Sequence, residues 1–440
     1  MKNIFVGLLL AVAFLVFSVL AAHSQPYAFT TALGSASNPG NADGTNAAAQ
    51  FISPTGLALG NQGDLFVVDG NAIRKITTSG TNRSVRTLTG LIGLHSFADG
   101  TNSAARFNYP QGVAADAAGN LYVADTYNNA IRKITPVGTN WVVTTIAGSA
   151  PPASLFGSVD GTNNNARFHN PYGIAVDSAT NLYVTDSLNH TIRKISPVGA
   201  NWVVTTLAGL ANVSGSANGS NSTARFNGPV SVAVDSAGVI YVADFLNHTI
   251  RKLIASGTNW SVTTLAGSPG VPGTSDGVGS AAGFNLPQDI AIDAGQNLFV
   301  TDSGNNTIRK ISPAGKVSTL AGSPGIPGSA DGTGSTALFN QPYGVAVDAS
   351  GILYVADYLN YSIRAGQVAP LMQLSASGQQ LILSWPAGLT GVVPEFCNSL
   401  SAGCWSPMPT NGAVRVEDYF FLTNSRSSGS QFFRLHKQTP

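Results

Sequence analysis

Short apolar runs bounded by Gly, Asn or Asp recur along most of the chain, and beyond the N-terminal segment none has the period of an amphipathic helix. Each run is rich in β-branched residues and has the length of a strand. The blocks of one unit are Gly173–Asp177, Leu182–Asp186, Ile192–Ile195 and Val204–Gly209. This pattern predicts four short strands per unit, of which the first is apolar enough to be buried on both faces.

The unit occurs six times. The arginine of its third block returns at intervals of 55 to 61 residues, at Arg74, Arg132, Arg193, Arg251, Arg309 and Arg364. Four strands per unit, repeated radially, are typical of a β-propeller. We therefore predict an all-β fold with a six-bladed β-propeller over residues 26–369.

The two ends of the repeat array complement each other. Residues 27–34 match the fourth-strand block at residues 141–148, whereas the sixth unit lacks that block after Arg364. We expect the N-terminal strand to complete the last blade beside residues 362–368. Closing the ring in this way removes the exposed edges that a linear array would leave.

The turn before the third strand carries Asn189-His190 in one unit and Asn247-His248 in the next. Together with the preceding blocks, these motifs resemble the signature of NHL repeats, named for Asn-His-Leu, although Thr follows the histidine here and the period is near 58 residues. The resemblance implies the propeller fold over about 340 residues. It does not imply one function, because similar propellers bind proteins, bind RNA or act as enzymes.

The ends of the chain indicate export and a second module. An apolar run over residues 4–22 follows Lys2 and ends in Ala22-His23-Ser24, which predicts a signal peptide over residues 1–24; an uncleaved anchor is the alternative. We expect a secreted, periplasmic or cell-envelope protein with no membrane span after cleavage. Lys and Arg total 22 against 21 Asp and Glu, which argues against a nucleic-acid partner.

Residues 371–440 lie outside the repeat. Their short apolar blocks, with Ser-Trp-Pro at 384–386 and Phe-Phe-Arg-Leu at 432–435, resemble the small β modules that end some secreted bacterial proteins. The resemblance implies a β-sandwich-like C-terminal module. Cys397 and Cys404, the only cysteines, would form a small-loop disulfide in an oxidising compartment, and two free thiols are equally compatible with the sequence.

Residues repeated in every blade have a structural explanation. We expect each repeated arginine to pair with an Asp of its own or the adjacent blade, or with loop carbonyls, because the guanidinium fork suits a carboxylate. His190 and His248 occupy matching turns, and we expect them to pack on their own blades.

Candidate binding residues remain once the repeat is subtracted. First strands line the channel of a propeller, and Asp289 stands just before one of them, where other blades have Gly or Ser. Neighbouring positions and the turns after the second strands carry aromatic and amide side chains, which suit a peptide or sugar, or else simply cover the blade tops. The candidates are Gln111, Tyr127, Tyr172, Phe245, Gln288, Asp289, Tyr343 and Tyr358.

Glutamate is missing from the predicted propeller, because Glu395 and Glu417 both lie beyond it. We therefore assign no catalytic residue, metal ligand or cofactor, and we favour a non-enzymatic scaffold that binds a protein or polysaccharide at the channel mouth. The alternative is a metal-dependent lyase or hydrolase with a divalent metal near Asp289. A purely structural envelope component is a third reading.

Overall fold

The computed structural model describes residues 27–79, 82–149 and 155–369, together with strands and a few adjoining residues between 373 and 437. Residues 27–367 form one compact unit, and the C-terminal strands belong to another. The predicted signal peptide and Cys404 lie outside the described residues. No helix in the described part of the chain is long and apolar enough to cross a membrane.

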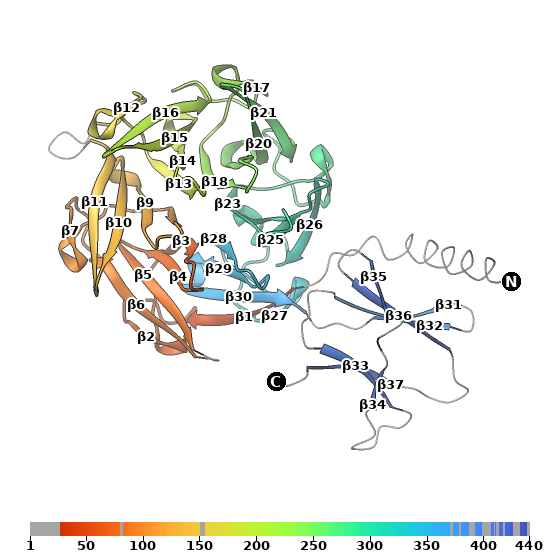
Figure 1. Cartoon of the computed structure of the whole chain (residues 1–440). Coiled ribbons are helices and arrows are strands. Elements are labelled where there is room, and N and C mark those ends of the chain that lie inside the picture. The colour runs from red at the N-terminus through yellow and green to blue at the C-terminus, as the bar shows by residue number, and fades with distance from the viewer. Residues whose placement is uncertain are drawn as a thin grey trace. The chain divides into compact units, whose positions relative to one another are not determined.

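Six antiparallel sheets are arranged as the blades of one ring (Figure 1). The innermost strands are β3 (Pro54–Leu59), β8 (Val113–Ala115), β13 (Pro171–Val176), β18 (Pro229–Val234), β23 (Pro287–Ile292) and β28 (Pro342–Val347). The second strands are β4 (Leu65–Asp69), β9 (Leu121–Asp125), β14 (Leu182–Asp186), β19 (Ile240–Asp244), β24 (Leu298–Asp302) and β29 (Leu353–Asp357). The third strands are β5 (Ala72–Ser79), β10 (Ala130–Val137), β15 (Thr191–Val198), β20 (Thr249–Ser256), β25 (Thr307–Ile311) and β30 (Ser362–Val368).

The outer part of each blade differs from the prediction by one element. The fourth strands are β6 (Asn82–Gly90), β11 (Asn140–Gly148), β16 (Asn201–Ala208), β21 (Asn259–Ala266), β26 (Lys316–Ala321) and β1 (Tyr27–Gly34). A fifth, two-residue strand covers each of them: β2 (Gly44–Thr45), β7 (Gly100–Thr101), β12 (Gly161–Thr162), β17 (Gly219–Ser220), β22 (Gly277–Val278) and β27 (Gly332–Thr333). These Gly-containing pieces are too short to show a strand pattern in the sequence.

The ring closes as predicted. Strand β1 lies between β27 and β30 in the last blade, so the N-terminal strand completes a sheet built otherwise from the sixth repeat (Figure 1). Phe29 of β1 is fully buried and meets Phe339 edge to face, with 5.1 Å between ring centroids. Burial of such an aromatic side chain contributes on the order of 2 kcal/mol to holding the ends of the ring together.

A buried arginine in the third strand organises each blade, which confirms the expected pairing. Arg132 bonds Asp125 of its own second strand at 2.6 Å and Asp99 at 2.7 Å, and its guanidinium lies over the Phe107 ring at 5.2 Å. The same arrangement surrounds Arg74, Arg193, Arg251, Arg309 and Arg364, except that Asn218 stands in for the second carboxylate beside Arg251.

One face of the propeller carries the turns between the second and third strands, and we call it the turn face. These one-turn 3-10 helices are η3 (Thr126–Asn128), η5 (Ser187–Asn189), η7 (Phe245–Asn247), η9 (Ser303–Asn305) and η11 (Tyr358–Asn360). Further 3-10 turns follow the fifth strands: η1 (Asn46–Ala48), η2 (Asn102–Ala104), η4 (Asn163–Asn165), η6 (Asn221–Thr223), η8 (Gly279–Ala281) and η10 (Gly334–Thr336).

The C-terminal segments form two small sheets. One contains β31 (Gln373–Ser377), β32 (Gln380–Pro386), β36 (Tyr419–Ser425) and β35 (Val414–Val416). The other contains β34 (Ser406–Pro407), β33 (Val392–Cys397) and β37 (Phe432–Lys437). Buried Leu383, Trp385, Met408 and Leu422 pack together in this module. Cys397 is disulfide-bonded and ends β33.

Candidate functional site

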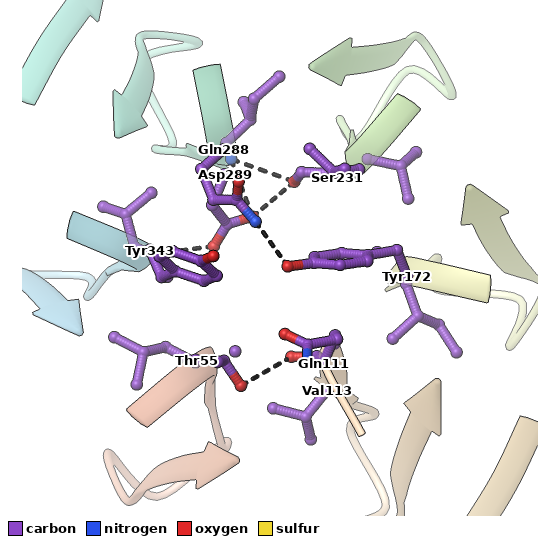
Figure 2. Close-up of a pocket in the computed structure, with 18 residues that line it drawn as sticks. Thr55, Gln111, Val113, Tyr172, Ser231, Gln288, Asp289 and Tyr343 are labelled. Carbon is purple, nitrogen blue, oxygen red and sulfur yellow. Dashed lines mark hydrogen bonds between the residues drawn. The ribbon is translucent and has the colours of Figure 1, made fainter. Parts of the chain in front are cut away.

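The first strands of all six blades line the central channel (Figure 2). Each blade contributes the residues that follow the proline at or beside the strand start, so six copies of one sequence position meet around one axis. The cavity between them has a volume of about 80 Å³. That is room for a few water molecules and well below the roughly 300 Å³ of a typical small-molecule pocket.

Glycine at the second residue after this proline allows neighbouring first strands to lie close together. A Cβ at Gly112 would collide with the carbonyl oxygen of Tyr172 in the next blade, and a Cβ at Gly344 would collide with that of Thr55. Ser231 and Asp289 hold this position in two consecutive blades. The ring therefore has one sector where side chains, rather than backbone contacts, join neighbouring first strands.

Asp289 bridges three blades in that sector. Its Oδ1 accepts hydrogen bonds from the Ser231 hydroxyl at 2.5 Å and from the backbone N–H of Ile290 at 2.9 Å, and its Oδ2 accepts one from the N–H of Val345 at 2.8 Å. Burial raises the pKa of this carboxyl to about 6, because the donors that reach it are neutral and offset only part of the desolvation. Asp289 thus holds the inner ring together.

Two tyrosines and an amide occupy the channel mouth. The Gln288 amide nitrogen donates to the Tyr172 hydroxyl at 2.8 Å, although these residues belong to different blades. Tyr343 lies on the other side of the opening, as Figure 2 shows, and stacks on Tyr358 with 4.5 Å between centroids. Burial raises the pKa of Tyr172 well above its usual value, so its hydroxyl stays protonated at neutral pH.

The structure brings most of the predicted site residues together. Gln111 lines the channel beside Thr55 (Figure 2). Phe245 and Tyr172 pack against the same core cluster. Tyr127 lies elsewhere: its ring is 5.1 Å from that of Tyr109, away from the channel lining.

The separation of Tyr127 has a simple geometric reason. Phe245 is the first residue of its 3-10 turn, whereas Tyr127 is the second residue of the matching turn. Successive residues of a 3-10 helix point about 120° apart, so a shift by one position sends the side chain in another direction. Tyr127 is 54% exposed on the turn face.

Two aromatic stacks on the turn face were not predicted. His95 stacks on Tyr109 with 4.4 Å between centroids, and Phe156 stacks on His169 at the same distance. His95 and Phe156 come from loops after the fourth strand, which vary between blades, so no repeated position marked them. The only signal of these stacks in the sequence was that His95 and His169 fall outside the Asn-His motif.

The motif histidines join blades instead of packing only on their own. The Nδ1 of His190 accepts a hydrogen bond from the backbone N–H of Gly228, and His248 accepts one from Leu286. Burial lowers the pKa of both imidazoles, which favours the neutral form that can accept. Among the described residues, no group of three or more His, Cys, Asp or Glu is placed to hold a metal ion.

The comparisons with known proteins agree with this architecture. The family model described as NHL repeat matches residues 107–134, 226–253 and 284–311. Each match runs from the phenylalanine before a first strand to the end of the Ile-Arg segment. The chain is therefore a six-bladed β-propeller in which three segments match the NHL repeat.

Individual proteins are similar to this chain over part of their length, in sequence or in fold. Protein SUPPRESSOR OF QUENCHING 1 of Arabidopsis thaliana is 32% identical over 66% of this chain, and the chain spans only 28% of that relative. A structural genomics protein of unknown function from Bacteroides thetaiotaomicron has a TM-score of 0.60 at 22% identity, covering 78% of this chain and 76% of that one. An auxiliary nutrient binding protein from the same species has a TM-score of 0.58 at 17% identity, covering 78% and 77%.

Proposed function

We propose that this chain is an exported, non-enzymatic scaffold that binds a protein or polysaccharide on its turn face, around the channel mouth. The observation that carries the proposal is the narrow channel. Its cavity of about 80 Å³ is too small for a polymer, while aromatic side chains lie at its opening. A partner would therefore lie across the mouth.

The chemistry of the mouth suits recognition. Tyr343 and Tyr358 are stacked, partly exposed rings, and the buried Gln288 amide holds the Tyr172 hydroxyl at the same opening. Aromatic rings supply contact area at small entropic cost, and amides and hydroxyls supply directional hydrogen bonds. The propeller holds these groups on rigid strands, so little ordering is needed on binding.

Two further points support export and binding. The signal peptide predicted over residues 1–24 would take the chain out of the cytoplasm. The auxiliary nutrient binding protein of Bacteroides thetaiotaomicron, which shares the fold alone at 17% identity, is consistent with a binding role for such a propeller.

The test compares the two faces of the propeller. Tyr343→Ala with Tyr358→Ala removes the stacked pair, and Val198→Ser changes an exposed side chain where a third strand ends on the opposite face. Purified mature protein is screened on a polysaccharide array and in a pull-down from cell-envelope extract, and any partner is then titrated with each variant. We expect the double variant to bind at least about tenfold more weakly and Val198→Ser to bind normally.

Two results would contradict the proposal. Equal binding by the double variant would place the site elsewhere. Turnover of a screened glycan that needs a divalent metal and is lost in Asp289→Ala would favour the lyase or hydrolase alternative.

A further inference from the structure

The first stack of the turn face has an open aromatic surface. The rings of His95 and Tyr109 are nearly parallel, 19° apart, and the Tyr127 ring tilts against Tyr109 at 54°. Tyr109 is 44% exposed and Tyr127 54% exposed. Three rings therefore support one another and still leave aromatic area for a ligand.

A chain of hydrogen bonds selects the tautomer of His95. The Asn71 side-chain oxygen accepts from the backbone N–H of Tyr109 at 3.0 Å, so the Asn71 amide nitrogen is the group that meets Nδ1 of His95 at 2.9 Å. An amide nitrogen donates only, so Nδ1 must be the acceptor. The neutral imidazole then carries its proton on Nε2, a donor at a defined place beside the two tyrosine rings.

The second stack lies on the next blade. Phe156 is 66% exposed and stacks on His169 at 23°, and burial lowers the pKa of His169 so that it stays neutral. The two blades are joined beside the stacks, because Asn129 accepts a hydrogen bond from the N–H of Asn170 at 2.9 Å. The turn face thus presents two ring stacks on consecutive blades.

The propeller fold does not require these rings. The positions that match Tyr127 are Leu188, Leu246, Gly304 and Leu359, and the positions that match Tyr109 are Asn170, Gly228, Leu286 and Gln341. Tyr109 has a φ of 45°, a backbone region where a bulky residue costs free energy and Gly or Asn fits better. Tyr109 is 44% exposed, so burial offsets only part of this cost and leaves part of the ring open to another contact.

We propose that His95, Tyr109, Tyr127, Phe156 and His169, the aromatic strip, bind neighbouring sugar rings of an uncharged polysaccharide. This assignment rests on the proposed function and adds the class of ligand. Flat ring faces suit the C–H faces of a sugar, and the fixed Nε2–H suits a hydroxyl. Two stacks on consecutive blades suit a polymer that presents several rings in a row.

Charge and edge geometry favour a neutral glycan. Arg106 and Arg167, which precede the first strands of these blades, donate to backbone carbonyls, and Arg132 and Arg193 are buried in ion pairs. The two ring stacks themselves contain no Lys, Arg, Asp or Glu, so none of their own groups selects an acidic polymer. A peptide that adds as a strand needs a free sheet edge, and β7 and β12 already pair with the middle of the outer strands β11 and β16.

The experiment uses the mature chain and a panel of soluble neutral polysaccharides, with a carboxylated polysaccharide for comparison. Tyr127→Ala with Phe156→Ala removes the two most exposed rings of the strip. Leu246→Ala with Leu359→Ala is the matched control, since these side chains occupy the Tyr127 position on other blades. Thermal unfolding of all variants checks that each one folds.

We expect at least one neutral polysaccharide to bind, its affinity to fall at least about tenfold in the strip variant, and the control to match the wild type. Equal glycan binding by the strip variant would overturn the strip and leave the proposed scaffold intact. A protein partner found without any glycan binding, or preference for the carboxylated polymer, would overturn the assigned ligand class. If the wild-type chain bound neither a polysaccharide nor a protein, both proposals would be wrong.

Discussion

The Nδ1 atom of His190 accepts a hydrogen bond from the backbone N–H of Gly228 in the next blade, at 3.0 Å. His248 makes the same bond to Leu286 at 3.1 Å. Other blades use an amide oxygen at this position, on Asn71, Asn129 and Asn306. In these five blades the His position of the repeat is therefore an acceptor that joins the blade to its successor, and Tyr361 holds the position in the sixth.

The double variant His190→Asn, His248→Asn should weaken the pH dependence of stability. Burial lowers both imidazole pKa values below the ordinary 6.5, so the unfolded chain takes up protons first as the pH falls. Stability from the neutral histidines is complete above pH 6.5 and is lost below it. Asparagine accepts at every pH. Between pH 7.5 and 5 the variant should therefore lose about 1 kcal/mol less unfolding free energy per junction than the wild type.

Urea unfolding of both proteins at several pH values measures this difference. Because both proteins contain the same carboxylates, the effect of carboxylate titration cancels when their stabilities are subtracted. His95→Asn is the comparison, because Nδ1 of His95 accepts from the Asn71 side chain and not from a backbone N–H of the next blade. Parallel stability curves for wild type and double variant would show that the histidines are not neutral acceptors.

The fold was predictable because six copies of one unit average out local exceptions. Each arginine and each apolar block recurs, and residues 27–34 match a fourth strand closely enough to place β1 in the last blade. The junction role of His190 was not predictable, since its partner is a backbone group 38 residues away. The aromatic strip was missed for a related reason: stacking depends on where two non-repeated loops meet.

Asn218 interrupts a carboxylate series, and Asn218→Asp should stabilise the fourth blade. Arg251 donates to its amide oxygen at 2.9 Å, whereas the other blades have Asp here. In a neighbouring blade Asp160 also accepts from the N–H of Thr206, a bond that an amide nitrogen cannot make. The position is about half exposed in the other blades, so we expect a gain of about 0.5 kcal/mol, reduced at high salt.

Differential scanning calorimetry at two salt concentrations measures that gain. Asp160→Asn makes the reverse change and should lower the unfolding temperature by a similar amount. A lower unfolding temperature for Asn218→Asp would mean that Arg251 is already fully neutralised by Asp244.

Asp289→Asn should destabilise the propeller most at acidic pH. The variant weakens the bridge to Ser231 and Val345 at any pH. Burial raises the wild-type pKa to about 6, above its unfolded value, so this carboxyl contributes most when protonated and its contribution falls as the pH rises from 4 to 7. Asparagine does not titrate, so the difference in unfolding free energy between wild type and variant should narrow over that pH range.

Denaturant midpoints of both proteins at pH 4, 5.5 and 7 measure this difference in stability. A difference that widens with pH would show that the folded protein favours the carboxylate form of Asp289. The Ser231→Gly variant restores the residue of four other blades, and it should reduce the effect of Asp289→Asn because the two side chains share a hydrogen bond.

Gly366 and Phe29 form a compensating pair in the blade that closes the ring. In the other five blades this cross-strand pair is Ile or Leu with Val, as in Ile134 with Val143. A Cβ at Gly366 would collide with the Phe29 ring. Gly366→Ile alone should therefore cost about 1–3 kcal/mol through overpacking, and Phe29→Val alone about 1–3 kcal/mol through a cavity. Together they restore the common pair, so equilibrium unfolding should show a double variant closer to wild type than the sum of both losses; additive losses would show that the two side chains do not share one space.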